Sequence, residues 1–160
     1  MASFEFLAIT LTGLGLTASI IYYANVLSNA NQTRKAQLFL NIYNITLNEE
    51  MNDKWYNAMT ADIKEFQHKR QDLHTLWQKY NGIGHLMVQG LLDVESAYHY
   101  SEGWRSALLW MKWGEVIIDM RKVGTNPDYM DGFEYMAGRI MEYRIEKGLP
   151  NEMPPIFQIP

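Results

Sequence analysis

The feature that most constrains this chain is residues 6–33, a run without a single charged side chain. The hydrocarbon core of a bilayer is about 30 Å thick, and roughly 20 apolar residues cross it as a helix. Residues 4–27 would form a helix of about 36 Å, which is long enough to span a membrane with some tilt. Tyr22 and Tyr23 lie near its C-terminal end, where aromatic rings favour the membrane interface. The run therefore predicts a membrane anchor.

Two other interpretations of this run stay open. A secretory signal peptide begins with a basic segment, whereas this chain begins MASFE and has no clear small-residue cleavage site after a short apolar segment. A buried central helix of a soluble bundle is also compatible, because the threonines and serines make the run only moderately apolar.

The flanking charges predict how the anchor is oriented. Glu5 lies on the N-terminal side, whereas Arg34 and Lys35 follow the run. Cytoplasmic flanks of spans carry an excess of Lys and Arg. We therefore expect a single-pass protein of the cell membrane, with the N-terminus outside and the C-terminal domain in the cytoplasm.

Small side chains form one stripe along the predicted span. They recur at steps of four, three and four residues, on one helical face: Ala8, Thr12, Gly15 and Ser19. In lipid, small residues let two helix backbones approach closely. The stripe predicts packing against another membrane-protein subunit or a second copy, unless these residues are merely the small residues common in spans.

The rest of the sequence predicts helices only. Apolar residues recur at helical spacing from Leu73 to Met87, and no run alternates as a strand would. No glycine or proline lies between residues 16 and 81, so the helix of the anchor should continue beyond the membrane. The predicted fold class is all-α: an N-terminal transmembrane helix that continues into a small cytoplasmic helical bundle.

Individual residues predict where the later helices begin and end. Residues 60–71 are polar and indicate a connector with about one helical turn. Asp93 should cap the short helix that follows it. Asn126 and Pro127 should begin the last helix, and Gly148 should end it.

These patterns divide the chain into an anchor at residues 1–33, a cytoplasmic helical domain at 34–148 and an extended tail at 149–160. The net charge of −4 and the lack of a basic cluster argue against a nucleic-acid partner. The absence of cysteine excludes disulfides, iron–sulfur clusters and a thiol nucleophile.

Several segments are together similar to an uncharacterised prokaryotic family. They are the N-terminal span with YYANVL, then RKAQLFLNIYN, YNGIGHLMVQGLLDVESAYHY, a tryptophan-bearing helix and FEYMAGRIMEYR. Members of that family, many of them archaeal, are small membrane-anchored helical proteins. The resemblance covers nearly the whole chain and implies this architecture. It implies no enzymatic activity and no mapped site, and it assigns no role to NGIGHL or to the tryptophans.

Candidate metal ligands are sparse. Glu65 and His68 have the Glu-x-x-His spacing that places both side chains on one helical face, as in di-iron bundles. Such sites need two of these motifs and two further glutamates, whereas this chain has one motif. We therefore expect no metal and no cofactor.

Candidate acid–base residues occur in small groups that also have structural explanations. Glu115 and Asp119 are neighbours on one helix, and Asp128, Asp131 and Glu134 suit the positive end of the last helix dipole. The segment 98–100 (YHY) beside Glu102 is compatible with a hydrogen-bonded cluster, but we favour a partly buried histidine whose hydrogen bonds are satisfied within the fold. No nucleophile elbow, phosphate-binding loop or dinucleotide fingerprint is present.

Three tryptophans mark the segment 103–120: Trp104, Trp110 and Trp113. Beside Arg105 and Lys112 they are candidate interaction aromatics, because Trp and Arg dominate protein-binding hot spots. A helix with apolar residues on two sides is also typical of the centre of a bundle, and we favour that interpretation.

Together these features predict a non-enzymatic single-span membrane protein whose cytoplasmic helical domain binds other proteins. We expect it to be an accessory subunit of a membrane complex or a homo-oligomer. The alternative is a membrane-anchored enzyme or metal-binding bundle that uses histidines and carboxylates.

Overall fold

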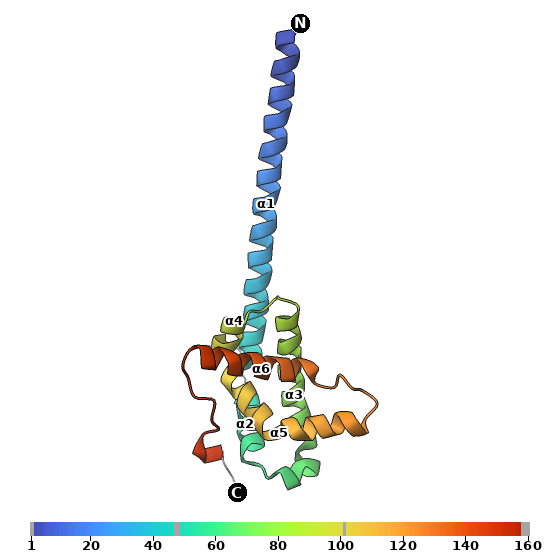
Figure 1. Ribbon diagram of the computed structural model, residues 1–160, viewed down its shortest axis with the longest axis vertical. Helices are drawn as coiled ribbons and strands as arrows, with labels where there is room; N and C mark the ends of the chain where they lie inside the picture. Colours follow the sequence, from blue (N-terminus) through green and yellow to red (C-terminus); the bar gives the residue numbers. More distant parts are fainter. Residues whose placement is uncertain (1, 47–48, 101, 158–160) are drawn as a thin grey trace. The chain divides into compact units, whose positions relative to one another are not determined.

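The computed structural model describes residues 2–46, 49–100 and 102–157, and across these ranges every regular element is a helix (Figure 1). Within them, the side chains at positions 2, 3, 5, 7–9, 35, 36, 38, 39, 42, 43, 45, 46, 65–69 and 100 are not described. The elements are α1 (Ala2–Thr46), α2 (Glu49–Thr60), η1 (Ile63–Glu65), α3 (Phe66–Val88), α4 (Val94–Tyr100), α5 (Gly103–Val123), α6 (Asp131–Glu146) and η2 (Pro155–Phe157). The all-α prediction is confirmed.

The chain forms two compact units, Met1–Leu38 and Phe39–Pro160. Helix α1 runs through the boundary without a break, as the absence of glycine and proline predicts. The boundary lies a few residues beyond the one expected at residue 33, and the C-terminal tail belongs to the second unit.

The first unit is the N-terminal part of α1. Its stretch Thr10–Arg34 is long and apolar enough to cross a membrane, and none of that stretch is buried within the protein. A central helix of a soluble bundle would be largely buried, so this finding argues against the buried-helix alternative.

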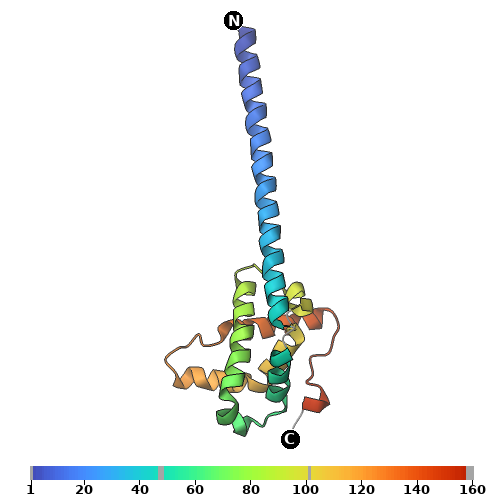
Figure 2. The same ribbon diagram turned by 180° about the vertical axis from the view of Figure 1, so that it is seen from behind.

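The second unit is a bundle in which α6 lies across α3 and also packs against α5 (Figures 1 and 2). Its fully buried large side chains are Trp77, Trp113, Tyr80, Phe133, Met59, Leu73, Leu76, Leu109, Ile117, Met136 and Ile140. Burial of one such side chain contributes about 1.5–3 kcal/mol. The apolar face predicted from Leu73 to Met87 is buried throughout, so helical periodicity located the α3 side of this core.

Two predicted helix boundaries are confirmed. The Asp93 carboxylate accepts a hydrogen bond from the Ser96 backbone N–H at 2.7 Å and caps α4. Gly148 follows α6 with a φ of +69°, a conformation that favours glycine. The backbone N–H of Leu149 then reaches back to the Arg144 carbonyl at 2.8 Å, which completes the helix end.

Two predicted boundaries are wrong. Helix α3 begins at Phe66, so the connector is shorter than residues 60–71. The last helix begins at Asp131, because Asn126 caps only a turn and Met130 adopts a left-handed φ of 60° before α6. Met130 is buried, so packing of this side chain favours a conformation that interrupts the helix.

The C-terminal tail follows the surface of the second unit up to η2. The Asn151 side-chain amide donates to the Met141 carbonyl at 2.8 Å. Further on, the Phe157 ring lies edge-on to Trp55 with centroids 5.4 Å apart. The described part of the predicted tail, residues 149–157, is therefore non-helical except for the short η2 turn and is held against the bundle.

Candidate functional site

The small-residue stripe lies on the exposed surface of the first unit. Thr12, Gly15 and Ser19 are all exposed, and the side chain of Ala8 lies outside the described residues. A Cβ added to Gly15 would have no neighbour within 4 Å, so the surface there is open. The stripe stays a predicted helix-packing surface.

Three hydroxyl groups in the first half of the span are satisfied within the helix. Thr10 and Thr17 donate to the carbonyls of Phe6 and Gly13 at 2.8 and 2.9 Å. Ser19 donates to a carbonyl one turn earlier at 2.8 Å. A polar group without a hydrogen-bond partner in hydrocarbon raises the free energy by roughly 2–7 kcal/mol. These internal bonds make the moderately polar run compatible with lipid.

Trp113 is a core residue and not part of an interaction surface. Its side chain is fully buried, and its indole N–H donates to the Ala58 carbonyl at 3.1 Å. The neighbouring Lys112 ammonium donates to the Met59 carbonyl at 2.5 Å. Both carbonyls lie in the last turn of α2, where a helix leaves acceptors unpaired, so α5 supplies the donors that end α2.

Trp104 and Trp110 are half-buried. The guanidinium of Arg144 lies 3.6 Å above the centroid of Trp104, which is a cation–π contact. Trp110 meets the Phe133 ring edge-on with centroids 5.2 Å apart. The core interpretation therefore holds for Trp113, whereas the other two combine core packing with partial exposure.

The segment NGIGHL has a structural role at the crossing of α3 and α6. The Asn81 side-chain oxygen Oδ1 accepts a hydrogen bond from the Phe133 backbone N–H at 3.1 Å, in the first turn of α6. His85 Nε2 lies 3.3 Å from the Asp131 carboxylate. Gly84 faces Gly132 so closely that a Cβ at Gly84 would overlap its carbonyl. The segment thus caps and positions α6.

A partly buried charge cluster joins α3 to the start of α5. Glu102 accepts hydrogen bonds from the Lys79 ammonium at 3.1 Å and from the Tyr80 hydroxyl at 3.3 Å. Arg105 donates to its other oxygen at 2.5 Å. Glu102 itself has a φ of 55°, in the left-handed region. These bonds fix the residue at which α5 begins.

Burial in this cluster shifts the pKa of two of its members. Burial raises the pKa of the Tyr80 phenol well above its usual value, and the neighbouring Glu102 carboxylate adds to this rise. Burial lowers the pKa of Lys79, although the same carboxylate opposes that shift. Because Glu102 meets three donors, it is satisfied within the fold and has the character of a structural ion cluster.

The other titratable candidates do not converge on a metal centre in the described part of the chain. No group of three or more His, Asp or Glu residues there is placed to hold a metal ion. The side chains of Glu65 and His68 lie outside the described residues. Asp119 pairs with Lys122 at 2.8 Å, and Glu134 pairs with Arg121 at 2.6 Å.

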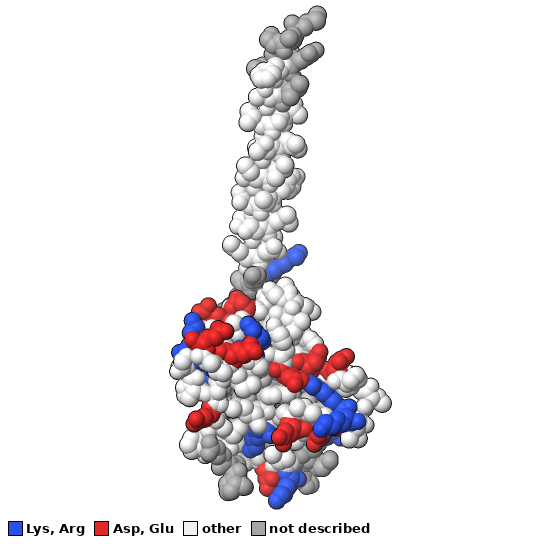
Figure 3. Space-filling view, viewed as in Figure 1, with Lys and Arg blue, Asp and Glu red and all other residues white. Residues whose placement is uncertain are grey.

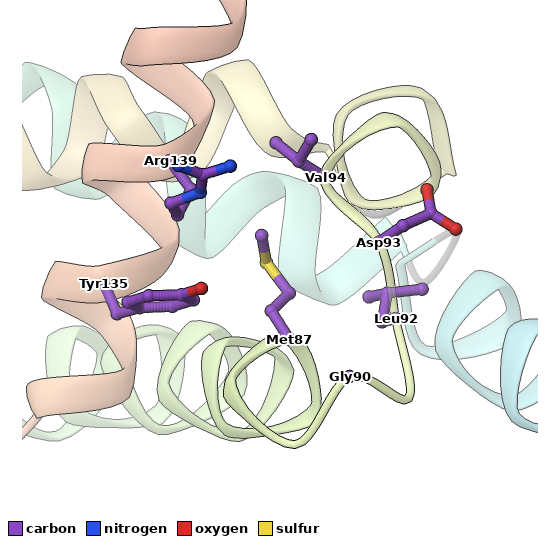
Figure 4. A pocket seen from close by; sticks show the side chains of 7 residues that line it. All are labelled: Met87, Gly90, Leu92, Asp93, Val94, Tyr135 and Arg139. Carbon is purple, nitrogen blue, oxygen red and sulfur yellow. The ribbon is translucent and has the colours of Figure 1, made fainter.

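One pocket opens between the end of α3, the loop to α4 and one face of α6 (Figure 4). Its volume is about 310 Å³, at the small end of the range for ligand sites. Its lining residues are Met87, Gly90, Leu92, Asp93, Val94, Tyr135 and Arg139.

The pocket has an apolar floor and charged groups at its rim. Met87 and Leu92 are buried beneath it. At the rim, Arg139 pairs with Glu142 at 2.7 Å, and the Asp93 carboxylate is engaged in capping α4. Because these charged groups already have partners, the pocket suits an apolar side chain or chain segment better than a charged substrate.

Sequence reasoning missed Arg144 and Lys79, both of which are central to the folded domain. The Arg144 side chain is 8% exposed, and its guanidinium donates to the Tyr98 hydroxyl at 2.8 Å. In the sequence, Arg144 stands among Glu142, Glu146 and Lys147, a pattern that is typical of a solvated helix face. Its partner Trp104 lies on another helix, so no local pattern signals the contact.

No protein-family model matches the sequence, and no curated protein or solved structure matches it either.

Proposed function

We propose that the protein is a single-pass membrane protein whose cytoplasmic helical domain binds other proteins and catalyses no reaction. The observation that carries this proposal is the exposed apolar surface of α1. Five of its large aliphatic side chains are each 58–65% exposed: Leu11, Leu14, Leu16, Ile20 and Ile21. Transfer of such surface out of water is favourable by about 25 cal/mol per Å², so a bilayer is the environment that suits this helix.

The proposed orientation of the span in the membrane rests on the charged residues that flank it. The stretch Thr10–Arg34 ends at a basic residue, and Lys35 follows. Figure 3 presents acidic and basic side chains together over the second unit, whereas the described surface along the span is uncharged. Because cytoplasmic flanks of membrane spans carry an excess of Lys and Arg, the proposed location of the second unit is the cytoplasm.

The charged groups favour a binding role over catalysis, because they already have partners within the fold. Glu102, Arg121 and Arg144 are engaged within the fold, and the rim of the pocket is paired as well. The candidate surfaces for a partner are the stripe in the span and the pocket beside α6. The partner class is another membrane-protein subunit or a second copy of this chain.

Alkaline carbonate extraction tests the anchor. Membranes that contain the full chain are washed at alkaline pH, which removes proteins held only by surface charge. We expect the protein to stay in the membrane pellet, because the span contacts hydrocarbon along its whole length. Release of the intact chain into the supernatant would contradict the anchor.

Cysteine accessibility tests the orientation, since the sequence contains no cysteine. Glu152→Cys, in the exposed part of the tail, should resist a membrane-impermeant thiol reagent in intact cells and react after lysis. Ser3→Cys is the matched variant and should react in intact cells. The reverse labelling pattern would invert the orientation.

Affinity purification in mild detergent tests the binding role. The full chain should retain a membrane-protein subunit or a second copy at fixed stoichiometry. A protein that purifies as a monomer and instead turns over a substrate would overturn this proposal.

A further inference from the structure

An uncharged loop closes the end of α3 and leads to α4. Residues 86–92 (LMVQGLL) contain no charged side chain. At the tip, Val88 is 58% exposed and Leu91 is 47% exposed. The loop is well defined, because the backbone N–H groups of Leu91 and Leu92 both donate to the Leu86 carbonyl, at 2.9 and 3.2 Å. Gly90 supplies the positive φ of 68° that this turn requires.

The loop lies at the end of the second unit where the chain enters from α1. Residues 39–46 of α1 belong to this unit. Figures 1 and 2 show them and the loop that follows α3 at the same end of the second unit. Leu40, in this part of α1, is also exposed at 54%.

The covalent connection keeps this end of the unit close to the predicted membrane surface. The candidate span ends at Arg34, and the second unit begins at Phe39. Five residue steps reach at most about 17 Å when fully extended, and about 7.5 Å as a helix. This limit on the distance between Arg34 and Phe39 holds for every orientation of the second unit relative to the span.

We propose that the tip of this loop, residues 88–91, inserts Val88 and Leu91 into the interfacial layer of the bilayer that α1 spans. The inference rests on the proposed membrane anchor. Two exposed aliphatic side chains on an uncharged turn would bind a membrane weakly by themselves. The short connection raises their effective concentration at the surface to the millimolar range or above, so a weak contact becomes populated.

The consequence for the domain is a fixed orientation on the membrane. The span and the loop tip would be two separate lipid contacts, and two contacts restrict the rotation that one tether allows. The same loop forms one wall of the pocket, through Gly90 and Leu92 (Figure 4). Insertion would therefore hold the mouth of the pocket near the bilayer, where a subunit in the same membrane can reach it.

Depth-dependent fluorescence quenching in reconstituted vesicles tests the contact. Leu91→Cys in the full chain is labelled with an environment-sensitive fluorophore and placed in phosphatidylcholine vesicles. A fraction of the lipids carries a nitroxide quencher at a shallow position of the acyl chain. We expect a blue-shifted emission and a drop in intensity of twofold or more with the quencher lipid.

Two other single-cysteine variants separate the possible failures. Val123→Cys, at an aliphatic residue of the same unit that is 89% exposed, should be unquenched. Leu16→Cys, within the span, should be quenched whether or not the loop inserts. Quenching at Leu16 but not at Leu91 overturns the loop contact and leaves the anchor intact. An unquenched label at Leu16 overturns the anchor and the loop contact together.

Further outcomes test whether protein contact or unspecific adsorption, and not insertion into lipid, accounts for the signal at the loop tip. A blue shift at Leu91 without lipid quenching would mean that protein covers the tip, and it would overturn the lipid contact. Equal quenching at Leu91 and Val123 would do so as well, because the adsorption would then be unspecific. Conversely, Leu91→Asp with the label at Val88→Cys should lose the quenching, while thermal unfolding of the domain stays unchanged.

Discussion

Gly84 and Gly132 meet where α3 crosses α6, and neither position has room for a Cβ. A Cβ at Gly84 would overlap the Gly132 carbonyl, and a Cβ at Gly132 would lie 2.5 Å from the Asn81 carbonyl oxygen. The contact is between backbones, which cannot turn aside as a flexible side chain can. The two glycines therefore determine how closely the two helices pack.

Gly84→Ala should destabilise the second unit by about 2 kcal/mol, in the range of overpacked cores. The measurement is urea unfolding of the full chain in mild detergent, followed by tryptophan fluorescence. All five tryptophans lie in the second unit and report on its unfolding.

Gly82→Ala is the matched control on the same helix. A Cβ there has no neighbour within 4 Å, so the higher helix propensity of alanine should stabilise the unit by about 0.5–1 kcal/mol. Equal effects of the two substitutions would contradict the close packing of α3 on α6.

Arg144 should hold the C-terminal tail on the bundle. Its guanidinium donates to the Pro150 carbonyl and to the Tyr98 hydroxyl, and it stacks on Trp104. Arg144→Lys retains the charge but not the planar fork, so we expect a loss of about 2–3 kcal/mol. Hydrogen exchange in residues 149–157 should become faster at the same time.

Arg139→Lys provides the comparison for this prediction. Arg139 is exposed and pairs only with Glu142 among the hydrogen bonds and ion pairs described, so its replacement should change stability by less than about 0.5 kcal/mol. Unchanged exchange of the tail in the Arg144 variant would mean that other contacts, such as Phe157 against Trp55, hold the tail.

Tyr80 should make stability fall at alkaline pH. Burial raises the pKa of its phenol well above the usual value, so the folded protein keeps a proton that the unfolded chain releases above about pH 10. The stability that the protonated Tyr80 phenol contributes is thus fully present below about pH 10 and is lost as the pH rises further. Tyr80→Phe should remove this loss, which reaches about 1.4 kcal/mol per pH unit above 10.

The comparison between Tyr80→Phe and the wild type also separates Tyr80 from Lys79. Burial lowers the pKa of Lys79, so its proton loss favours the folded state as the pH rises, which is the opposite sign. Lys79 is present in both proteins, and its effect largely cancels in the difference. Tyr56→Phe removes an exposed phenol and should keep the wild-type slope; parallel curves for all three proteins would refute the assignment.

Gly15→Leu tests the stripe in the span. The substitution places a branched side chain where close helix approach needs none, and it keeps the helix apolar enough to insert. We expect dissociation of a homo-oligomer or subunit complex on native gels in mild detergent, with membrane insertion unchanged.

Leu16→Ala, on another side of the same helix, should leave the assembly intact. If neither substitution changes the assembly, the span serves as a tether only. The binding surface would then lie on the second unit.

The sequence by itself determined the helical architecture and two helix boundaries. The lack of charge in residues 6–33 and the apolar period from Leu73 to Met87 are local patterns that neighbouring residues encode. Asp93 and Gly148 act through groups a few residues away, so their roles were also predictable. Their physical effects do not depend on how the helices are packed.

Only the tertiary structure decided what the polar and glycine residues of the second unit do. The Trp113 indole meets a carbonyl 55 residues earlier, and Asn81 caps a helix 52 residues later. The start of α6 also depends on tertiary packing, because the Met130 side chain is buried and the helix begins only after it, at Asp131. Such contacts depend on which helices pack together, and packing is a property of the whole core that no short segment carries.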